Sequence, residues 1–147
     1  MRALLWTVLL GDVCFAQSVT VRVINDNDKR PVPKQAVMVQ FFYENPKGIS
    51  APTYLTTDDT GETRFTILEP RPKQVSVGVT LTSERWRCAC WLKIEPTRML
   101  QKGALMKPPG NLARPSRTPS EAKPGEIVFV ARPYTLLEKL LDPLMRE

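Results

Sequence analysis

The predicted fold is organised around Thr56-Thr-Asp-Asp-Thr-Gly61-Glu-Thr-Arg-Phe-Thr-Ile67, which has the pattern of a strand, a tight turn and a second strand. The side chains of Asp58 and Asp59 can accept hydrogen bonds from nearby backbone N–H groups, and Gly61 can adopt the positive φ that many tight turns need. Threonine, phenylalanine and isoleucine favour strands on both sides of this turn. The stretch therefore predicts a hairpin whose strands cover residues 53–57 and 62–68.

On both sides of this hairpin, alternating apolar and polar residues predict further strands. The alternation is cleanest where Val75, Val77 and Val79 alternate with polar residues and glycine. These strands cover residues 18–24, 36–43, 74–81, 85–94 and 126–131. In 85–94, Leu92 and Ile94 share one face, and Trp91 lies on the other. Short strands with turn signals between them predict an all-β fold, a seven-stranded antiparallel Greek-key sandwich of the prealbumin or Ig-like kind.

Two segments depart from the strand pattern. Residues 95–124 are rich in proline and lack any period, which predicts a long mobile loop with one helical turn near 97–102. Thr135-Leu-Leu-Glu138 has the spacing of a capping box, and a leucine stripe follows it. A short C-terminal helix is therefore expected over residues 135–142. Such a helix is unstable alone in water, so it must dock on this domain or mediate a homodimer.

The first sixteen residues have the pattern of an export signal: basic Arg2, an apolar run over 3–10, and small residues before a cleavage point after Ala16. That apolar run is too short for a permanent membrane anchor. The expected mature protein is therefore a single domain over residues 17–147, secreted or held in the periplasm or cell envelope, with no transmembrane segment.

Composition limits the chemistry. The chain has 147 residues, no histidine and a formal net charge of +6. Without histidine, Ser-His-Asp and Cys-His nucleophile systems and histidine-ligated zinc are excluded. The basic balance suits an acidic partner, but an ordinary basic protein without one is the plainer interpretation.

The sequence also resembles the transthyretin-like, carboxypeptidase-regulatory-like sandwich domains, which grade into bacterial Ig-like repeats. The resemblance rests on the first strand Val19-Thr-Val-Arg-Val-Ile24, on the second strand Pro33-Lys-Gln-Ala-Val-Met-Val39, and on Thr57-Asp-x-x-Gly-x-x-x-Phe-x-Ile67. It covers about residues 18–81. It implies a non-catalytic module, because domains of this kind are mostly attached to secreted enzymes, surface proteins and outer-membrane receptors.

Acidic residues gather in two predicted turns that an up-and-down strand order brings to one end of the sandwich. They are Asp26, Asp28, Asp58, Asp59 and Glu62. Ca²⁺ prefers about six to eight oxygen ligands, so a calcium site is one hypothesis. The alternative is that aspartate and asparagine are there because they form turns.

The opposite end is expected to be basic, with Arg98, Lys102, Lys107, Arg114 and Arg117 in the long loop. One hypothesis is that this loop contacts an anionic cell-envelope polymer or an acidic protein surface; a solvated linker is the alternative. We expect no nucleic-acid partner.

Trp91, among basic residues, is a candidate for an exposed stacking surface for sugar, although it can equally lie under the long loop or the tail helix. Cys88 and Cys90 point the same way on one strand, too far apart for a relaxed disulfide. Buried free thiols, a strained local disulfide and pairing with another chain all remain open.

Three functional hypotheses follow. The first is a non-catalytic, secreted or cell-envelope sandwich module that serves a binding or structural role. The second is a carbohydrate-binding module that uses an exposed tryptophan. The third is a small secreted enzyme or inhibitor that works through carboxylates and lysines in its loops.

Overall fold

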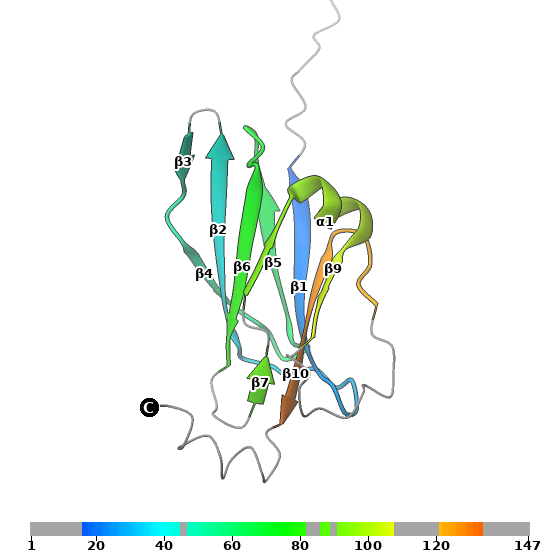
Figure 1. The fold of residues 1–147 in the computed structure, drawn as a ribbon. Coiled ribbons are helices and arrows are strands. Elements are labelled where there is room, and N and C mark those ends of the chain that lie inside the picture. The colour runs from blue at the N-terminus through cyan, green and yellow to red at the C-terminus, as the bar shows by residue number, and fades with distance from the viewer. Residues whose placement is uncertain (1–15, 45–46, 82–85, 89–90, 108–120, 134–147) are drawn as a thin grey trace, which may run out of the picture.

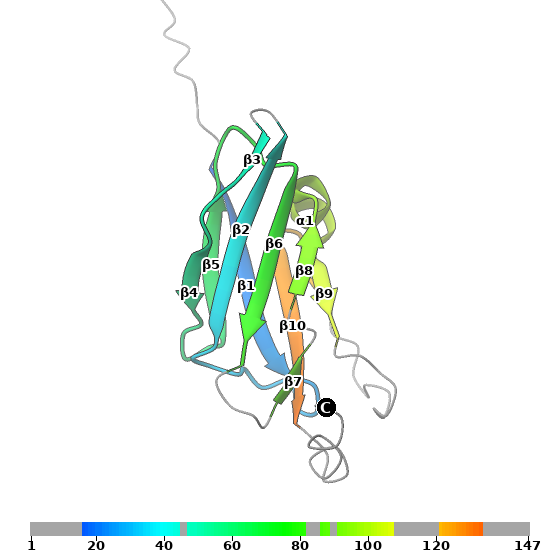
Figure 2. The same cartoon turned by 60° about the vertical axis from the view of Figure 1, so that its left-hand side comes forward.

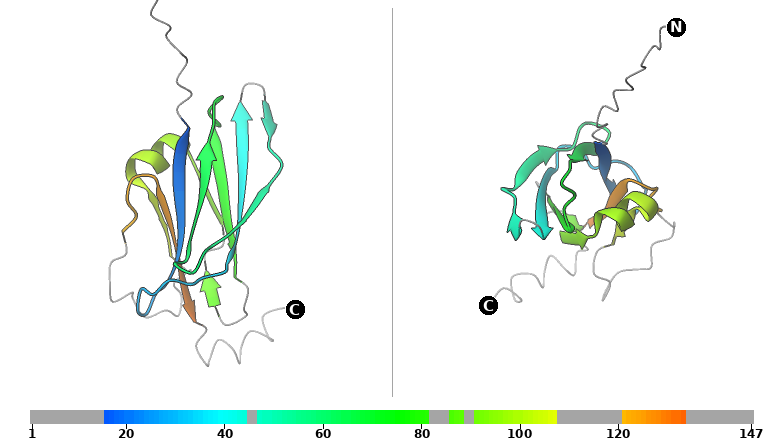
Figure 3. Two further views of the ribbon diagram at one scale, coloured as in Figure 1. Left: turned by 180° about the vertical axis from the view of Figure 1, so that it is seen from behind. Right: turned by 90° about the horizontal axis from the view of Figure 1, so that it is seen from above.

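A computed structural model describes residues 16–44, 47–81, 86–88, 91–107 and 121–133, which form two facing sheets (Figure 1; Figure 3, right). Sheet A contains β1 (Gln17–Asn25), β5 (Glu62–Ile67), β7 (Trp86–Cys88), β9 (Ala104–Met106) and β10 (Glu126–Pro133). Sheet B contains β2 (Ala36–Glu44), β3 (Lys47–Ile49), β4 (Thr53–Thr56), β6 (Gln74–Thr80) and β8 (Trp91–Ile94). A single short helix in the described part of the chain, α1 (Pro96–Lys102), links β8 to β9. The expectation of an all-β, two-sheet fold is confirmed.

The strand order differs from the predicted seven-stranded antiparallel arrangement. In sheet A, β10 pairs in parallel with both β1 and β9, and antiparallel with β7. In sheet B, β2 lies between β6 on one side and the short strands β3 and β4 on the other, and all pairs are antiparallel. The prediction was wrong here because side-chain alternation reveals which residues share a face but not which strand lies alongside.

The core lies between the sheets and is rich in valine. Val19, Val21 and Val23 on β1 face Val75, Val77 and Val79 on β6, and all six are buried. Phe129 on β10 is also fully buried. The inward faces predicted for these strands are confirmed, because a period of two places alternate side chains on the same side of a sheet.

The predicted hairpin over residues 53–68 was wrong in its pairing. β4 pairs with β2 in sheet B, whereas β5 pairs with β1 in sheet A, so the turn between them carries the chain from one sheet to the other (Figure 2). The turn itself was anticipated: Gly61 has φ +72°, and its N–H donates to the carbonyl of Asp58 at 3.0 Å.

The single strand predicted over residues 85–94 is also two strands. β7 belongs to sheet A and β8 to sheet B, so the chain changes sheets between Cys88 and Trp91. Cys88 ends β7, and Cys90 lies outside the described residues, so the expectation that both cysteines point the same way on one strand is not tested. An alternation that continues across a change of sheet looks the same in sequence as one longer strand.

The first part of the proline-rich segment 95–124 is ordered secondary structure. α1 confirms the helical turn expected near 97–102, whereas β9 was not anticipated. Pro96 occupies the first turn of α1, where its missing N–H is not needed, and Met99 is fully buried in the core. The helix predicted over 135–142 and the export signal lie outside the described residues.

Candidate functional site

The outer face of sheet B carries an exposed aromatic surface. Three of the large apolar side chains that remain exposed in the described residues come from this sheet: Tyr54 at 70%, Ile49 at 63% and Trp91 at 57%. Clustered exposed apolar side chains often mark a binding surface, whereas isolated ones need no explanation.

Trp91 lies flat on the sheet because its neighbour has no side chain. It stands directly opposite Gly78 on β6, and a Cβ atom added at that glycine would lie 2.8 Å from both Cε3 and Cζ3 of the indole. The six-membered ring therefore rests on the Gly78 backbone. A glycine inside a strand often marks such a close approach. The side chain of Trp91 nevertheless remains 57% exposed.

The register places Trp91 in a row that crosses the sheet. Tyr54 on β4 is opposite Met38 on β2, Met38 is opposite Gly78, and Gly78 is opposite Trp91. Three strand spacings separate the two ends of this row, which gives roughly 14 Å between Tyr54 and Trp91. We call these four residues the aromatic row.

Polar groups accompany the row on the same face. Gln40 and Ser76 lie opposite each other, and Lys93 lies opposite Ser76. The Gln40 side-chain amide donates to the Ser50 carbonyl at 3.2 Å, which fixes its orientation. The outer face of sheet B thus combines flat apolar surface with amide and hydroxyl groups beside it.

A second apolar strip follows these polar residues. The Lys93 ammonium lies 4.2 Å from the centroid of the Phe42 ring, a cation–π contact. Phe42 stands opposite Ile49 on β3. Because Lys93 rests on this ring, the positive charge is drawn toward β2.

The two turns that carry the predicted acidic residues lie at one end of the sandwich, although the strand order that led to this expectation was wrong. The β1–β2 turn and the β4–β5 turn are joined there by hydrogen bonds: the Gln35 N–H donates to Thr57 Oγ1 at 2.9 Å, and the Lys34 N–H donates to the Thr57 carbonyl at 3.1 Å. The structure therefore brings together the two turns that carry the acidic side chains.

Three of those acidic side chains form ion pairs with nearby basic residues instead of converging on one point. Lys29 contacts Asp26 at 3.0 Å, Arg30 contacts Asp28 at 3.5 Å and Lys34 contacts Asp59 at 2.8 Å. In the described part of the chain, no three acidic or cysteine side chains are arranged so that they could hold a metal ion.

Asp58 stabilises the turn between the sheets. Its Oδ1 accepts hydrogen bonds from Thr60 N and Oγ1, at 2.8 and 2.6 Å, and from Glu62 N at 3.0 Å. The Thr60 hydroxyl, followed by the backbone N–H of Glu62, lowers the pKa of the Asp58 carboxyl from 3.8. The neighbouring ion pair joins Asp59 to Lys34. The hydrogen bond and the charge of Asp59 raise the pKa of Lys34 from 10.5.

The predicted basic residues are divided among several elements. Arg98 and Lys102 belong to α1, and Lys107 follows β9, whereas Arg114 and Arg117 lie outside the described residues. Near the same end, Lys73 pairs with Glu44 at 2.7 Å and Arg71 with Glu69 at 3.7 Å. Arg98 and Lys102 form no ion pair with any residue that the structure describes.

Sequence reasoning identified Trp91 but missed the rest of the aromatic row. Gly78 was the available signal, because it interrupts the strand with the cleanest alternation in the chain. Tyr54 and Met38 gave no such signal, since their alignment with Trp91 depends on the pairing of four strands. No described helix has the length and hydropathy of a membrane span. Searches of family models, curated proteins and solved structures found no match to this chain.

Proposed function

We propose that this protein is a non-catalytic binding module that holds carbohydrate on the outer face of sheet B. The observation that carries the proposal is the indole of Trp91, which lies flat over Gly78 and remains 57% exposed. A ring fixed in this way presents a preformed surface, so little side-chain freedom is lost when a ligand stacks on it.

The chemistry of a sugar ring matches this surface. A pyranose has apolar C–H groups on its faces and hydroxyl groups around its rim. Trp91 and Tyr54 offer flat rings to the C–H faces, and the neighbouring Gln40 and Ser76 offer an amide and a hydroxyl to the rim. The row extends across the sheet, which favours a chain of sugars over a single one.

The proposal includes two expectations from the sequence. The pattern of residues 1–16 supports export, and the motifs within residues 18–81 support kinship with transthyretin-like modules. A polysaccharide of the cell envelope or its surroundings is the ligand class consistent with both. The aromatic row is the part of the proposal on which its test depends.

Pull-down on insoluble polysaccharides and affinity electrophoresis with soluble glucans would test the proposal. We expect the full chain to bind at least one member of a panel that contains cellulose, chitin, peptidoglycan and soluble β-glucan. Trp91→Ala should weaken that binding by about tenfold or more, because an aromatic contact and its buried area are both lost. Gly78→Ala should also weaken binding, since the added methyl displaces the indole without removing it.

Leu68→Ala is the matched control. Leu68 is a large apolar side chain, 58% exposed, that lies just past the end of β5 and away from the aromatic row. Its truncation should leave binding unchanged. A full chain that binds no member of the panel, or a Trp91→Ala variant that binds as well as the unaltered chain, would overturn the proposal.

A further inference from the structure

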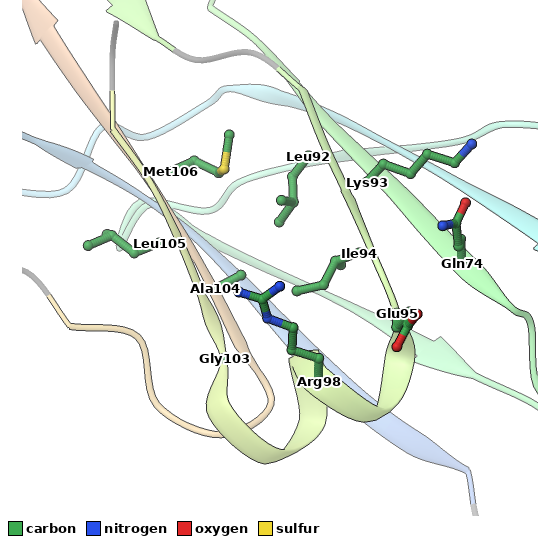
Figure 4. A pocket seen from close by; sticks show the side chains of 10 residues that line it. All are labelled: Gln74, Leu92, Lys93, Ile94, Glu95, Arg98, Gly103, Ala104, Leu105 and Met106. Atoms are coloured by element: carbon green, nitrogen blue, oxygen red, sulfur yellow. The ribbon is translucent and has the colours of Figure 1, made fainter. Parts of the chain in front are cut away.

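A pocket opens at the side of the sandwich, between β8 of sheet B and β9 of sheet A (Figure 4). Its volume is about 500 Å³, within the range of roughly 300–1,000 Å³ that is typical of small-molecule sites. β8 pairs only with β6, and β9 only with β10, among the described strands. The pocket therefore lies where the two sheets part and α1 bridges them.

The pocket lining combines polar residues with one apolar part that is continuous with the core. Leu92 and Ile94 come from β8, and Ala104 and Met106 come from β9. Leu92, Ala104 and Met106 pack against the core but are only partly buried. At this side, the interior of the sandwich reaches solvent. An apolar ligand that entered the pocket would complete the burial of these side chains and would be favoured by the hydrophobic effect.

A cation stands at the mouth of the pocket. Figure 4 shows the Arg98 side chain extending from α1 toward β9, while Glu95 lies at the junction of β8 with the helix. Arg98 is exposed and forms no ion pair with any described residue. Lys93, the other basic residue of the lining, is held against Phe42. The guanidinium of Arg98 is therefore the cation available to a ligand in this pocket.

We propose that this pocket binds an amphipathic monocarboxylic acid, a molecule with an alkyl or aromatic body and one carboxylate. The carboxylate would pair with Arg98, whose planar fork matches two carboxylate oxygens. The body would pack on Leu92, Ile94, Ala104 and Met106. This site is on a different side of the sandwich from the aromatic row, and it does not depend on carbohydrate binding.

Titration calorimetry of the full chain with decanoate tests the proposal. We expect saturable binding of one decanoate per chain, with weaker binding of the uncharged analogue decanol. Arg98→Gln should weaken decanoate binding by about tenfold or more, because it removes a charge-assisted hydrogen bond. Lys102→Gln is the matched control: it removes the same charge from the same helix, at a residue outside the pocket lining, and should leave the affinity unchanged.

Two further measurements locate the ligand. Ala104→Leu should weaken decanoate and decanol alike, because the larger side chain occupies the pocket. Decanoate should shift the NMR methyl signals of Met106 and Leu92 in the unaltered chain. Absence of saturable binding by the full chain, equal affinity of Arg98→Gln, or shifts confined to residues outside the pocket would each overturn the proposal.

Discussion

The outer faces of the two sheets differ in how far their side chains are buried. On sheet A, Ile24, Val128 and Val130 point away from the main core yet are buried, with Leu105 and Ala122 packed against them. On sheet B, the large outward side chains of Tyr54 and Trp91 remain exposed. Sheet A is thus covered on its outer face along β10, although Arg64 and Thr66 of β5 remain exposed, whereas the outer face of sheet B is open at Tyr54 and Trp91.

The primary structure shows the same difference. Residues 127–131 of β10 form the unbroken apolar run Ile-Val-Phe-Val-Ala, and all five are buried. Unbroken runs are typical of strands buried on both faces, and alternation is typical of strands buried on one. β6 alternates, with Gln74 and Ser76 outward. Because the outward side chains of β10 are buried and the large outward side chains of sheet B are open, an aromatic ligand surface is expected on sheet B.

The largest expected effect comes from placing a charge on each outer face. Val128→Asp puts a carboxylate at a fully buried position and should reduce the free energy of unfolding by about 4 kcal/mol or more. Ser76→Asp places the same group on sheet B, opposite Lys93, and should change it by less than about 0.5 kcal/mol. Urea denaturation of the two variants measures the contrast. Equal losses would show that the two outer faces do not differ.

The second-largest expected effect is a loss of stability from a substitution in the turn that connects the two sheets. Gly61→Ala forces a Cβ into a backbone with φ +72° and to within 2.8 Å of the Val23 carbonyl oxygen. The strain and the clash should together cost about 2–3 kcal/mol in thermal or urea unfolding. Because the turn joins sheet B to sheet A, we expect one cooperative transition at a lower midpoint. Separate transitions would contradict a shared core.

Strand positions and inward faces could be predicted from sequence because they depend on neighbours in the chain. The valines of β1 and β6 are examples: their spacing alone identifies the buried side. The partner of each strand could not be predicted from sequence. The parallel pairing of β10 with β1, for example, depends on contacts between residues that are about a hundred positions apart in the chain. β3 and β9, with three residues each, are too short to show any period.

The candidate site also has one part that could be predicted from sequence and another that could not. Trp91 could be singled out as an exposed ring because Leu92 and Ile94 fixed the inward face of its strand. Its alignment with Tyr54 needed the register of β4, β2, β6 and β8. The pocket beside Arg98 could not be foreseen at all, since it is formed by β8 and β9 from different sheets.

A smaller effect sharpens the contrast within sheet B. Gly78→Ala should lower the free energy of unfolding by about 1 kcal/mol, because the methyl group meets the Trp91 ring, which can move outward to relieve the contact. Ser76→Ala, at the preceding outward position of β6, should have almost no effect. Urea unfolding compares the two variants. A Gly78→Ala variant as stable as Ser76→Ala would show that the indole does not rest on the backbone.

The smallest effect concerns pH and belongs to the turn between the sheets. The pKa of Asp58 is lowered in the folded chain, mainly by the Thr60 hydroxyl, so its carboxylate stabilises the fold at pH values above the unfolded pKa of 3.8. That stabilisation should disappear as the pH falls from about 4 through the folded pKa, because protonation of the carboxyl then favours the unfolded chain. In Asp58→Asn the amide oxygen can still accept hydrogen bonds, but no charge titrates.

The unaltered chain should therefore be more stable than Asp58→Asn at pH 7, and the difference should narrow steadily as the pH approaches 3. Thermal unfolding at a series of pH values measures it. Asp59→Asn is the matched control, because the neighbouring carboxylate is 87% exposed, and its ion-pair partner, Lys34, is itself largely exposed. A stability difference for Asp58→Asn that stays constant between pH 7 and 3 would mean that the three hydrogen bonds to Oδ1 do not depend on its charge.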